Sequence, residues 1–374
     1  MFGWAKNAVG LTDKHHGAAA LHSVKAQTAE TPYTVLKKED EKWEIIDNTC
    51  VECKTFYITT DSGKLALVQI IYSNVLNVKK AGQIGVKVFS DDKAKPHVWH
   101  SDMVSDYQFV NDKYDFTSPK CSHKISEDGK TYTVKSTVNP ACTVDLKFTQ
   151  LAPSFMVGKD GTTYFGEDIK KPTGKMKHTF WPRAHVEGVI ITKDGHMDMA
   201  GKAMFVHVVQ GVKPHFAAAR WNFAHFQSPT YSALSMEYIT PPSYDNTVVS
   251  VGCVATDGKI IIANANSTAT HVRAVTDPDT GLPEPKAVTY AWFGKSDEGK
   301  DVTAEIKADF QEQRLDRIDI MDEIPKFLRG VITGAMGARP FIYQWGPLVN
   351  ITVNDGGNIK EEQGRLHCEA TFIS

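Results

Sequence analysis

The stretch TFYITTDSGKLALVQIIYS, residues 55–73, decides the fold class of this chain. It holds two runs rich in Tyr, Ile, Thr, Val and Leu, separated by Asp61, Ser62 and Gly63, and such a short link between two strand-like runs is typical of a β-hairpin. Similar turn residues recur beside strand-like segments farther along the chain, at Asp128-Gly129, Asp160-Gly161, Asp194-Gly195, Asp257-Gly258 and Asp355-Gly356. The body of the chain therefore predicts one antiparallel strand after another.

Helices are nearly absent from this pattern. Only residues 323–333, EIPKFLRGVIT, look helical in the body of the chain. Strands and helices do not alternate, which argues against a doubly wound nucleotide-binding fold. Long antiparallel meanders close into barrels or fold into sandwiches, and barrel closure removes the sheet edges. We expect an all-β protein.

The length of 374 residues favours two domains. Pro182 interrupts the strand-like run HTFWPRAHVEG, because proline cannot donate a hydrogen bond within a sheet. A division there gives two segments of barrel size, residues 32–183 and 184–374, preceded by residues 1–31. The expected architecture is two antiparallel barrels in tandem behind an N-terminal segment.

Composition excludes several classes of function. The net charge is −2, with no basic stripe, which argues against nucleic-acid binding. Six cysteines in a chain of this length do not suggest a disulfide framework and fit a reducing compartment. We find neither an apolar run long enough to span a bilayer nor a secretory signal peptide. A cytoplasmic protein is expected.

The N-terminus, MFGWAKNAVGL, has an amphipathic pattern. On a helical wheel its apolar residues fall on one half of the circumference, which predicts a helix that lies in a membrane interface. Only Lys6 and Lys14 are strong cations there, so insertion of apolar side chains outweighs attraction to anionic lipid. The alternatives are a segment packed on the protein's own body and a frayed tail; residues 12–31 form a tether. The predicted membrane-binding residues are Met1, Phe2, Trp4, Ala5, Ala8, Val9 and Leu11.

Two groups of residues suggest other chemistry. Cys50 and Cys53 form a C-x-x-C pair, but they lead directly into a strand, where residues three apart point to opposite faces. We interpret them as structural, while an oxidant-sensing role would need a lowered thiol pKa. His207, His215 and His225 are spaced irregularly, so we expect core or rim histidines. We expect no metal and no cofactor.

Four stretches resemble the fungal survival factor 1 family: TFYITTDSGKLALVQIIYSNV, FWPRAHVEG, HVVQGVKPHFAAARWNFAHFQSPTYSALSMEYITPPSY and the terminal EATFIS. The resemblance runs from about residue 32 to residue 374. It implies two lipocalin-like domains, survival under oxidative stress, and transfer of ceramide between endoplasmic reticulum and Golgi membranes. It also implies peripheral association with those membranes through an acetylated N-terminal helix. Whether the protein also occurs in the nucleus is left open. Acidic insertions of some longer members are missing here.

A lipid carrier has to hide alkyl tails from water, and each buried methylene contributes about 0.8 kcal/mol. Aromatic residues on or beside strands are candidates for lining a pocket inside a barrel or at the seam between two barrels: Trp99, Phe109, Trp181, Trp221, Phe223, Phe226, Trp292, Phe341 and Trp345. All of them could equally be core residues. The favoured function is non-enzymatic carriage of ceramide or a similar two-chain lipid. The alternatives are an enzyme acting on an apolar isoprenoid-like substrate and a stress-related scaffold with filled barrels.

Overall fold

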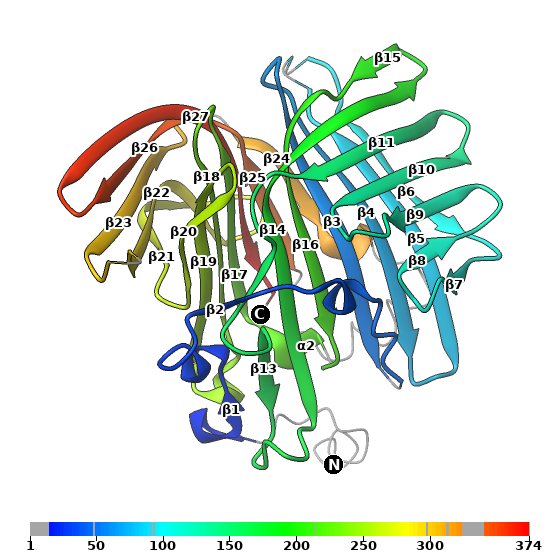
Figure 1. The fold of residues 1–374 in the computed structure, drawn as a ribbon. Coiled ribbons are helices and arrows are strands. Elements are labelled where there is room, and N and C mark those ends of the chain that lie inside the picture. Colours follow the sequence, from blue (N-terminus) through cyan, green and yellow to red (C-terminus); the bar gives the residue numbers. More distant parts are fainter. Residues whose placement is uncertain are drawn as a thin grey trace.

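A computed structural model describes residues 15–47, 49–90, 92, 94–212, 214–296, 298–311, 314–323 and 340–373. Two large antiparallel sheets lie side by side and account for most of the described chain (Figure 1). Strands β1 to β16 form the first sheet, and β17 to β27 form the second. Among the described residues, no helix has the length and apolar character needed to cross a bilayer.

The first sheet has a continuous ladder in the order β6-β5-β4-β3-β16-β14-β11-β10-β9-β8-β7. It curls until β6 approaches β10, where Asn139 Nδ2 donates to Asp102 Oδ2 at 3.2 Å. The ladder strands are β3 (Cys50–Thr60), β4 (Leu65–Val75), β5 (Lys79–Val88), β6 (Val98–Val104), β7 (Gln108–Val110), β8 (Asp115–Thr117), β9 (Cys121–Ile125), β10 (Thr131–Asn139), β11 (Cys142–Gln150), β14 (Gly174–Thr192) and β16 (Gly201–Gln210). Short strands complete it: β1 (Leu21–His22), β2 (Tyr33–Val35), β12 (Phe155–Val157), β13 (Thr162–Phe165) and β15 (Gly195–Asp198).

The second sheet has the order β20-β19-β18-β17-β27-β26-β23-β22-β21, with β25 on β27 and β24 on β25. It also curls, so that Asn264 Nδ2 on β20 donates to Phe293 O on β22 at 2.7 Å. Its strands are β17 (Arg220–Gln227), β18 (Ser232–Ile239), β19 (Val248–Thr256), β20 (Lys259–Asn264), β21 (Thr268–Thr276), β22 (Pro283–Lys295), β23 (Asp301–Asp309), β24 (Arg314–Asp319), β25 (Phe341–Trp345), β26 (Leu348–Asp355) and β27 (Asn358–Phe372). The short helices are η1 (Ala18–Ala20), η2 (Val24–Gln27), η3 (Lys38–Glu41), η4 (Pro242–Tyr244), α2 (Pro214–Ala217) and α3 (Ile320–Glu323).

The apolar core has three parts: one within each curled sheet and one between the sheets. Successive side chains of a strand point to opposite faces of the sheet, so neighbouring residues belong to different cores. Phe56 stacks on Phe148 inside the first sheet, with ring centroids 4.0 Å apart. The next residue, Tyr57, points the other way and packs on Phe223 of the second sheet at 4.6 Å. The middle strands are therefore covered on both faces, as in the interior of a sandwich.

The N-terminal arm ties the two sheets together (Figure 1). His16 N and Gly17 N donate to Ser243 O of η4, beside the second sheet. The arm then pairs with the first sheet through β1 on β13 and β2 on β12. It ends by placing Glu41 in the core of the first sheet, where this carboxylate is 2 % exposed. One strap thus contacts both halves of the molecule.

The prediction of an all-β chain is confirmed, with two large antiparallel sheets. The predicted N-terminal helix and most of residues 323–333 lie outside the described residues. The predicted domain boundary at 183/184 falls within β14, whereas the change of sheet lies between Gln210 and Arg220. Pro182 does not end its strand. It sits in a register shift between Trp181 and Ala184, a bulge where the missing N–H is tolerated.

Arg183 follows this bulge and clamps the sheets together. Its guanidinium is 1 % exposed and pairs with Asp257 across the boundary. Nη1 donates to Ser232 Oγ at 3.0 Å and to Ser228 O at 3.2 Å. The structure thus places this arginine against polar groups of the second sheet.

Replacing Arg183 by alanine should lower the free energy of unfolding by roughly 3 kcal/mol, since it leaves buried acceptors on the second sheet unpaired. Urea unfolding measures this change. Arg273→Ala is the matched control, because the Arg273 and Asp309 side chains are 52 % and 60 % exposed. An exposed pair contributes at most about 1 kcal/mol. Equal effects of the two variants would contradict the role of Arg183 as a clamp.

Candidate functional site

A cleft of about 780 Å³ opens at the end of the first sheet where β5 ends and β6 begins. We call it the rim cleft. Its apolar lining comes from Val88, Phe89, Pro96, Val98, Trp99 and Met197, and its polar lining includes Lys64, His97, His100, Thr192, Lys193 and Asp194. Volume and mixed lining are those of a small-molecule site.

The path of the strands explains the cleft. The ladder ends at β6, and the turns joining β10 to β11 and β14 to β15 contribute Ala141 and Lys193 to the opposite wall. Asn139 spans the gap, since its Nδ2 lies 3.0 Å from His100 Nδ1. The cleft is therefore the place where the curled sheet is closed by side chains instead of backbone hydrogen bonds.

A buried lysine supports the cleft from below. Lys87 Nζ lies 4.4 Å from the ring centroid of Trp99 and 4.7 Å from that of Phe89. The same ammonium group pairs with Asp316 and donates to Gln344 Oε1 at 2.7 Å, both on the second sheet. A cation beneath an aromatic ring attracts its π-face. The ammonium group of Lys87 thus lies beneath Trp99, and its own partners are on the second sheet.

His97 makes a second link between the cleft and the second sheet. Its Nδ1 accepts from Ser90 N at 2.9 Å, which leaves the proton on Nε2. That nitrogen donates to Leu315 O at 2.9 Å, at the start of β24. A histidine that lines the cleft is therefore fixed in tautomer and orientation by both sheets.

A polar group lies deeper, inside the first sheet, and none of its residues lines the rim cleft. Glu41 accepts from Trp181 Nε1 at 2.7 Å and from Tyr132 OH at 2.9 Å. Burial raises the pKa of Glu41, and burial lowers the pKa of Lys54 to about 8. Lys54 Nζ donates to Tyr132 OH at 3.2 Å and to the carbonyl of Glu41. These groups are closed off from solvent.

Glu52 is the second carboxylate of this interior. It accepts from the backbone N–H groups of Glu44 and Ile45 at 2.7 and 2.8 Å, and His207 Nε2 lies 2.7 Å from Oε1. Glu52 therefore fixes the end of the N-terminal arm against β3 and β16. His207 is a core histidine, as the sequence predicted. Within the described ranges, no three His, Cys, Asp or Glu side chains come together as a set that could hold a metal ion.

The nine predicted lining residues fall in different places. Trp99 lines the rim cleft. Trp181 and Phe109 belong to the core within the first sheet, and Trp221 and Phe223 to the core between the sheets. The others belong to the core within the second sheet: Phe226, Trp292, Phe341 and Trp345. The seven predicted membrane-binding residues lie outside the described residues, as does the side chain of His215.

Sequence reasoning missed Lys87, Asp316 and Gln344. A weak signal existed for Lys87, since it stands between two valines in the strand-like run QIGVKVF, where a lysine would be buried if the strand were covered. No local pattern indicated its partners.

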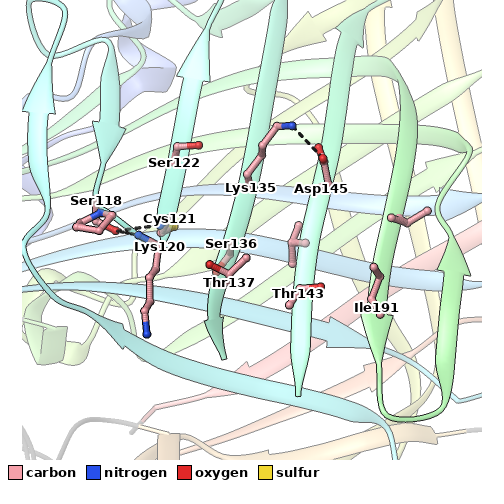
Figure 2. A pocket seen from close by; sticks show the side chains of 13 residues that line it. Ser118, Lys120, Cys121, Ser122, Lys135, Ser136, Thr137, Thr143, Asp145 and Ile191 are labelled. Atoms are coloured by element: carbon pink, nitrogen blue, oxygen red, sulfur yellow. Dashed lines mark hydrogen bonds and ion pairs between the residues drawn. The ribbon is translucent and has the colours of Figure 1, made fainter. Parts of the chain in front are cut away.

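A second hollow, of about 300 Å³, lies on the outer face of β9, β10, β11 and β14 (Figure 2). Figure 2 shows Lys135 and Asp145 reaching toward each other across two adjacent strands, and their charged atoms are 2.9 Å apart. Both side chains are more than half exposed. This trough is an open face on which exposed charged side chains stand beside apolar ones such as Val189 and Ile191, and we do not assign it a ligand.

All six thiols are free, and each has a raised pKa. Burial raises the pKa of Cys50 to about 12 and that of Cys53 to about 11. A thiolate is the reactive form, so a raised pKa is the reverse of what an oxidant sensor needs. The structural interpretation of the C-x-x-C pair fits this environment.

The folded protein should therefore react with a thiol reagent such as DTNB at pH 8 at least about a hundred times more slowly than the urea-unfolded chain, because a thiol with a pKa near 11 is ionised to about one part in a thousand. Absorbance at the reagent's product band follows the reaction. Unfolding should release six equivalents. Rapid labelling of Cys50 or Cys53 in the folded state would contradict the prediction.

Four buried histidines make the fold sensitive to acid. Burial lowers the pKa of His178 and of His225 to about 3, and it lowers the pKa of His123 and of His367 well below the usual range. In the unfolded chain a histidine binds its proton near pH 6.5. Below that pH the unfolded state binds more protons than the native state, so stability falls as the pH falls toward 3.

We expect the free energy of unfolding to decrease from pH 6.5 downward by up to about 1.4 kcal/mol per pH unit for each of these histidines. Glu41 and Glu369, whose pKa values are raised by burial, act with the opposite sign and offset part of the loss near pH 5. Urea unfolding at pH 7, 6 and 5 measures the slope, which His225→Gln should reduce. The matched control is His185→Gln at an exposed position on β14. An unchanged slope in His225→Gln would refute this assignment.

Residues 2–374 match the model of the Svf1 family. The chain belongs to the Svf1 family. A Neurospora crassa protein named "Ceramide-binding protein svf-1" is 44% identical over 381 residues, which cover 100% of both chains. The resemblance drawn from the sequence is confirmed.

Solved structures share the fold of this Svf1-family chain at low sequence identity. A Nitrosomonas europaea protein described as an AttH has a TM-score of 0.57 and 14% identity, and covers 91% of this chain and 98% of its own. Kievitone hydratase from Nectria haematococca has a TM-score of 0.52 and 15% identity, with 90% and 93% covered. At such identities the likeness extends to the architecture and no further.

Proposed function

We propose that this protein binds ceramide without converting it and carries it between membranes. The observation that carries the proposal is the full-length match to the Svf1 family, with a relative named as a ceramide-binding protein at 44% identity. Two lipocalin-like barrels closed by side chains form the carrier. In this proposal the lipid passes between endoplasmic reticulum and Golgi membranes, and the transfer supports survival under oxidative stress.

The rim cleft is the proposed binding site. Ceramide combines two alkyl chains with an amide and hydroxyl groups, so its site needs an apolar wall beside polar groups. Val88, Phe89 and Val98 supply such a wall, and His100 and Thr192 stand near it. The volume of about 780 Å³ lies within the range of about 300 to 1,000 Å³ that is usual for ligand sites. Each methylene removed from water there would contribute about 0.8 kcal/mol.

The enzyme alternative has one observation in its favour, the group of perturbed side chains around Glu41 and Lys54. Such groups are typical of active sites, but structural networks also perturb pKa values. Here each member is bonded to a neighbour inside a packed core, and the rim cleft does not reach it. We therefore favour binding over catalysis. The filled cores also agree with a scaffold, but a scaffold would not need the rim cleft.

Delivery to the bilayer is assigned to residues 1–11, with Phe2, Trp4 and Val9 inserting into the interface. An interfacial helix of this length binds weakly and reversibly. The carrier is then a cytoplasmic protein that associates peripherally with membranes of the endoplasmic reticulum and Golgi.

Trp99→Ala and Met197→Glu should each weaken the binding of a fluorescent short-chain ceramide by about tenfold or more, because they remove apolar wall from the cleft or place a charge in it. Fluorescence titration of the purified full chain measures the affinity. The matched control is Phe293→Glu, which changes an aromatic residue that is 47 % exposed on the second sheet. Lack of binding by the unmodified protein would refute the function. Binding that resists both cleft variants would refute the site.

A further inference from the structure

Two connections meet at the end of the first sheet that lies opposite the rim cleft. One joins β4 to β5 through Leu76, Asn77 and Val78; the other joins β13 to β14 through residues 166–173. Figure 1 shows both at the lower end of the first sheet. One groove of about 360 Å³ reaches from one to the other, since Leu76 of the first connection and Pro172 of the second both line it.

Both connections present aliphatic side chains to solvent. Val78 is 89 % exposed, Leu76 is 58 % exposed and Ile169 is 51 % exposed. Single exposed aliphatic residues are common on protein surfaces, but these three stand on two connections at the same end of the first sheet. We call this set the loop patch.

The backbone of the first tip is unusual. Leu76 and Asn77 have φ values of +53° and +58°. Asparagine tolerates this left-handed region, whereas leucine is strained there. Asn74, itself 1 % exposed, fixes the tip: its Nδ2 donates to Asn77 Oδ1 at 2.8 Å, and its Oδ1 accepts from Asn77 N at 3.1 Å. The turn itself would favour glycine or asparagine at position 76, and the leucine that stands there is 58 % exposed.

Lysines flank the aliphatic tips. Lys79 and Lys80 follow the first tip, Lys170 and Lys171 follow Ile169, and all four are exposed. Glu167 and Asp168 precede Ile169 and balance Lys170 and Lys171, so the net charge of +2 at the two connections comes from Lys79 and Lys80 at the start of β5. The protein as a whole has a net charge of −2. The excess of positive charge therefore lies beside the first tip, and the second tip has two lysines directly after its aliphatic residue.

We propose that the loop patch docks on the surface of an anionic lipid bilayer. Aliphatic tips enter the interface, and the lysines behind them lie level with the phosphate groups, an arrangement that combines burial of apolar area with attraction to anionic headgroups. A protein partner would not specifically require lysines beside each tip.

The path of the N-terminal arm supports a bilayer as the occupant. β1 pairs with β13, and His22 Nε2 lies 3.0 Å from the carbonyl of Gly166, the first residue of the second connection. The arm thus lies against the base of the loop patch shortly after residues 1–14. The inference rests on the proposed function in one respect, since a lipid carrier has to meet a bilayer. It adds a contact made by the folded body.

The decisive variant is Leu76→Asn/Val78→Ser in the full chain. Asparagine suits the left-handed turn, so the midpoint of urea unfolding should stay the same or rise. Co-sedimentation with phosphatidylcholine vesicles containing phosphatidylserine should weaken by about tenfold or more, through the loss of apolar area. The matched control is Val272→Ser, which removes an aliphatic residue that is 65 % exposed on the second sheet. Vesicle binding equal to that of the unmodified protein would overturn the proposal.

The lysines allow a second, independent experiment. Lys170→Glu/Lys171→Glu should abolish the preference for vesicles with phosphatidylserine over phosphatidylcholine alone, since each lysine near an anionic surface contributes about fivefold in binding. If the lysine variant still prefers vesicles that contain phosphatidylserine, the proposal is overturned. It is also overturned if Phe2→Asp/Trp4→Asp abolishes vesicle binding while both loop variants bind as well as the unmodified protein. Titration with fluorescent ceramide separates the docking hypothesis from the ceramide-binding hypothesis. The loop variants should keep their affinity for ceramide, so loss of docking can be told apart from loss of ceramide binding.

Discussion

The packing of one curled sheet against the other is the constraint on which the rest of the structure depends. Strands β3, β14 and β16 are covered on the inside by the core of the first sheet and on the outside by the second sheet. Their sequences must therefore be apolar on both faces, and each polar group on them needs a partner within the protein. Arg183 meets that demand with bonds to the second sheet, Glu52 with bonds to the N-terminal arm, and His207 by pairing with Glu52 on the neighbouring strand. The rim cleft depends on the same packing, because the charge beneath Trp99 finds its partners on the second sheet.

Local chemistry made part of this architecture predictable. The hairpin of residues 55–73 forms as β3 and β4, since Asp61, Ser62 and Gly63 allow a tight turn between two runs of strand-forming residues. The same reasoning took Pro182 as an interruption, whereas β14 continues through it with a bulge. A bulge depends on the partner strand β16, which a single-sequence pattern does not show. The pairing of Lys87 with Asp316 joins residues 229 apart in the chain, and no spacing rule covers such a distance.

The candidate site, too, was predictable only where it depends on local sequence and not on contacts between distant residues. Aromatic residues on strands were expected to line a lipid pocket, and Trp99 does line the rim cleft. Large aromatic side chains also give the most favourable burial, so most of the others fill cores: Phe226 and Trp181 are 0 % exposed. Sequence shows that an aromatic residue lies on a strand. Whether its face meets a core or the open rim depends on where the ladder ends, and that is a property of the whole sheet.

The proposed lipid site at the rim differs from a site inside a closed barrel in how a lipid would enter and leave. A lipid enclosed in a closed barrel can leave only if strands separate, which would break ladder hydrogen bonds and expose core residues such as Phe56 and Phe148. Between β6 and β10 no ladder has to open, since side chains such as Asn139 close that gap. In the proposed carrier, loading and release at the rim would need only side-chain and turn movements, which are fast compared with unfolding. The polar group around Glu41 and Lys54 lies apart from the rim, and its buried bonds would keep the interior rigid during the proposed exchange at the edge.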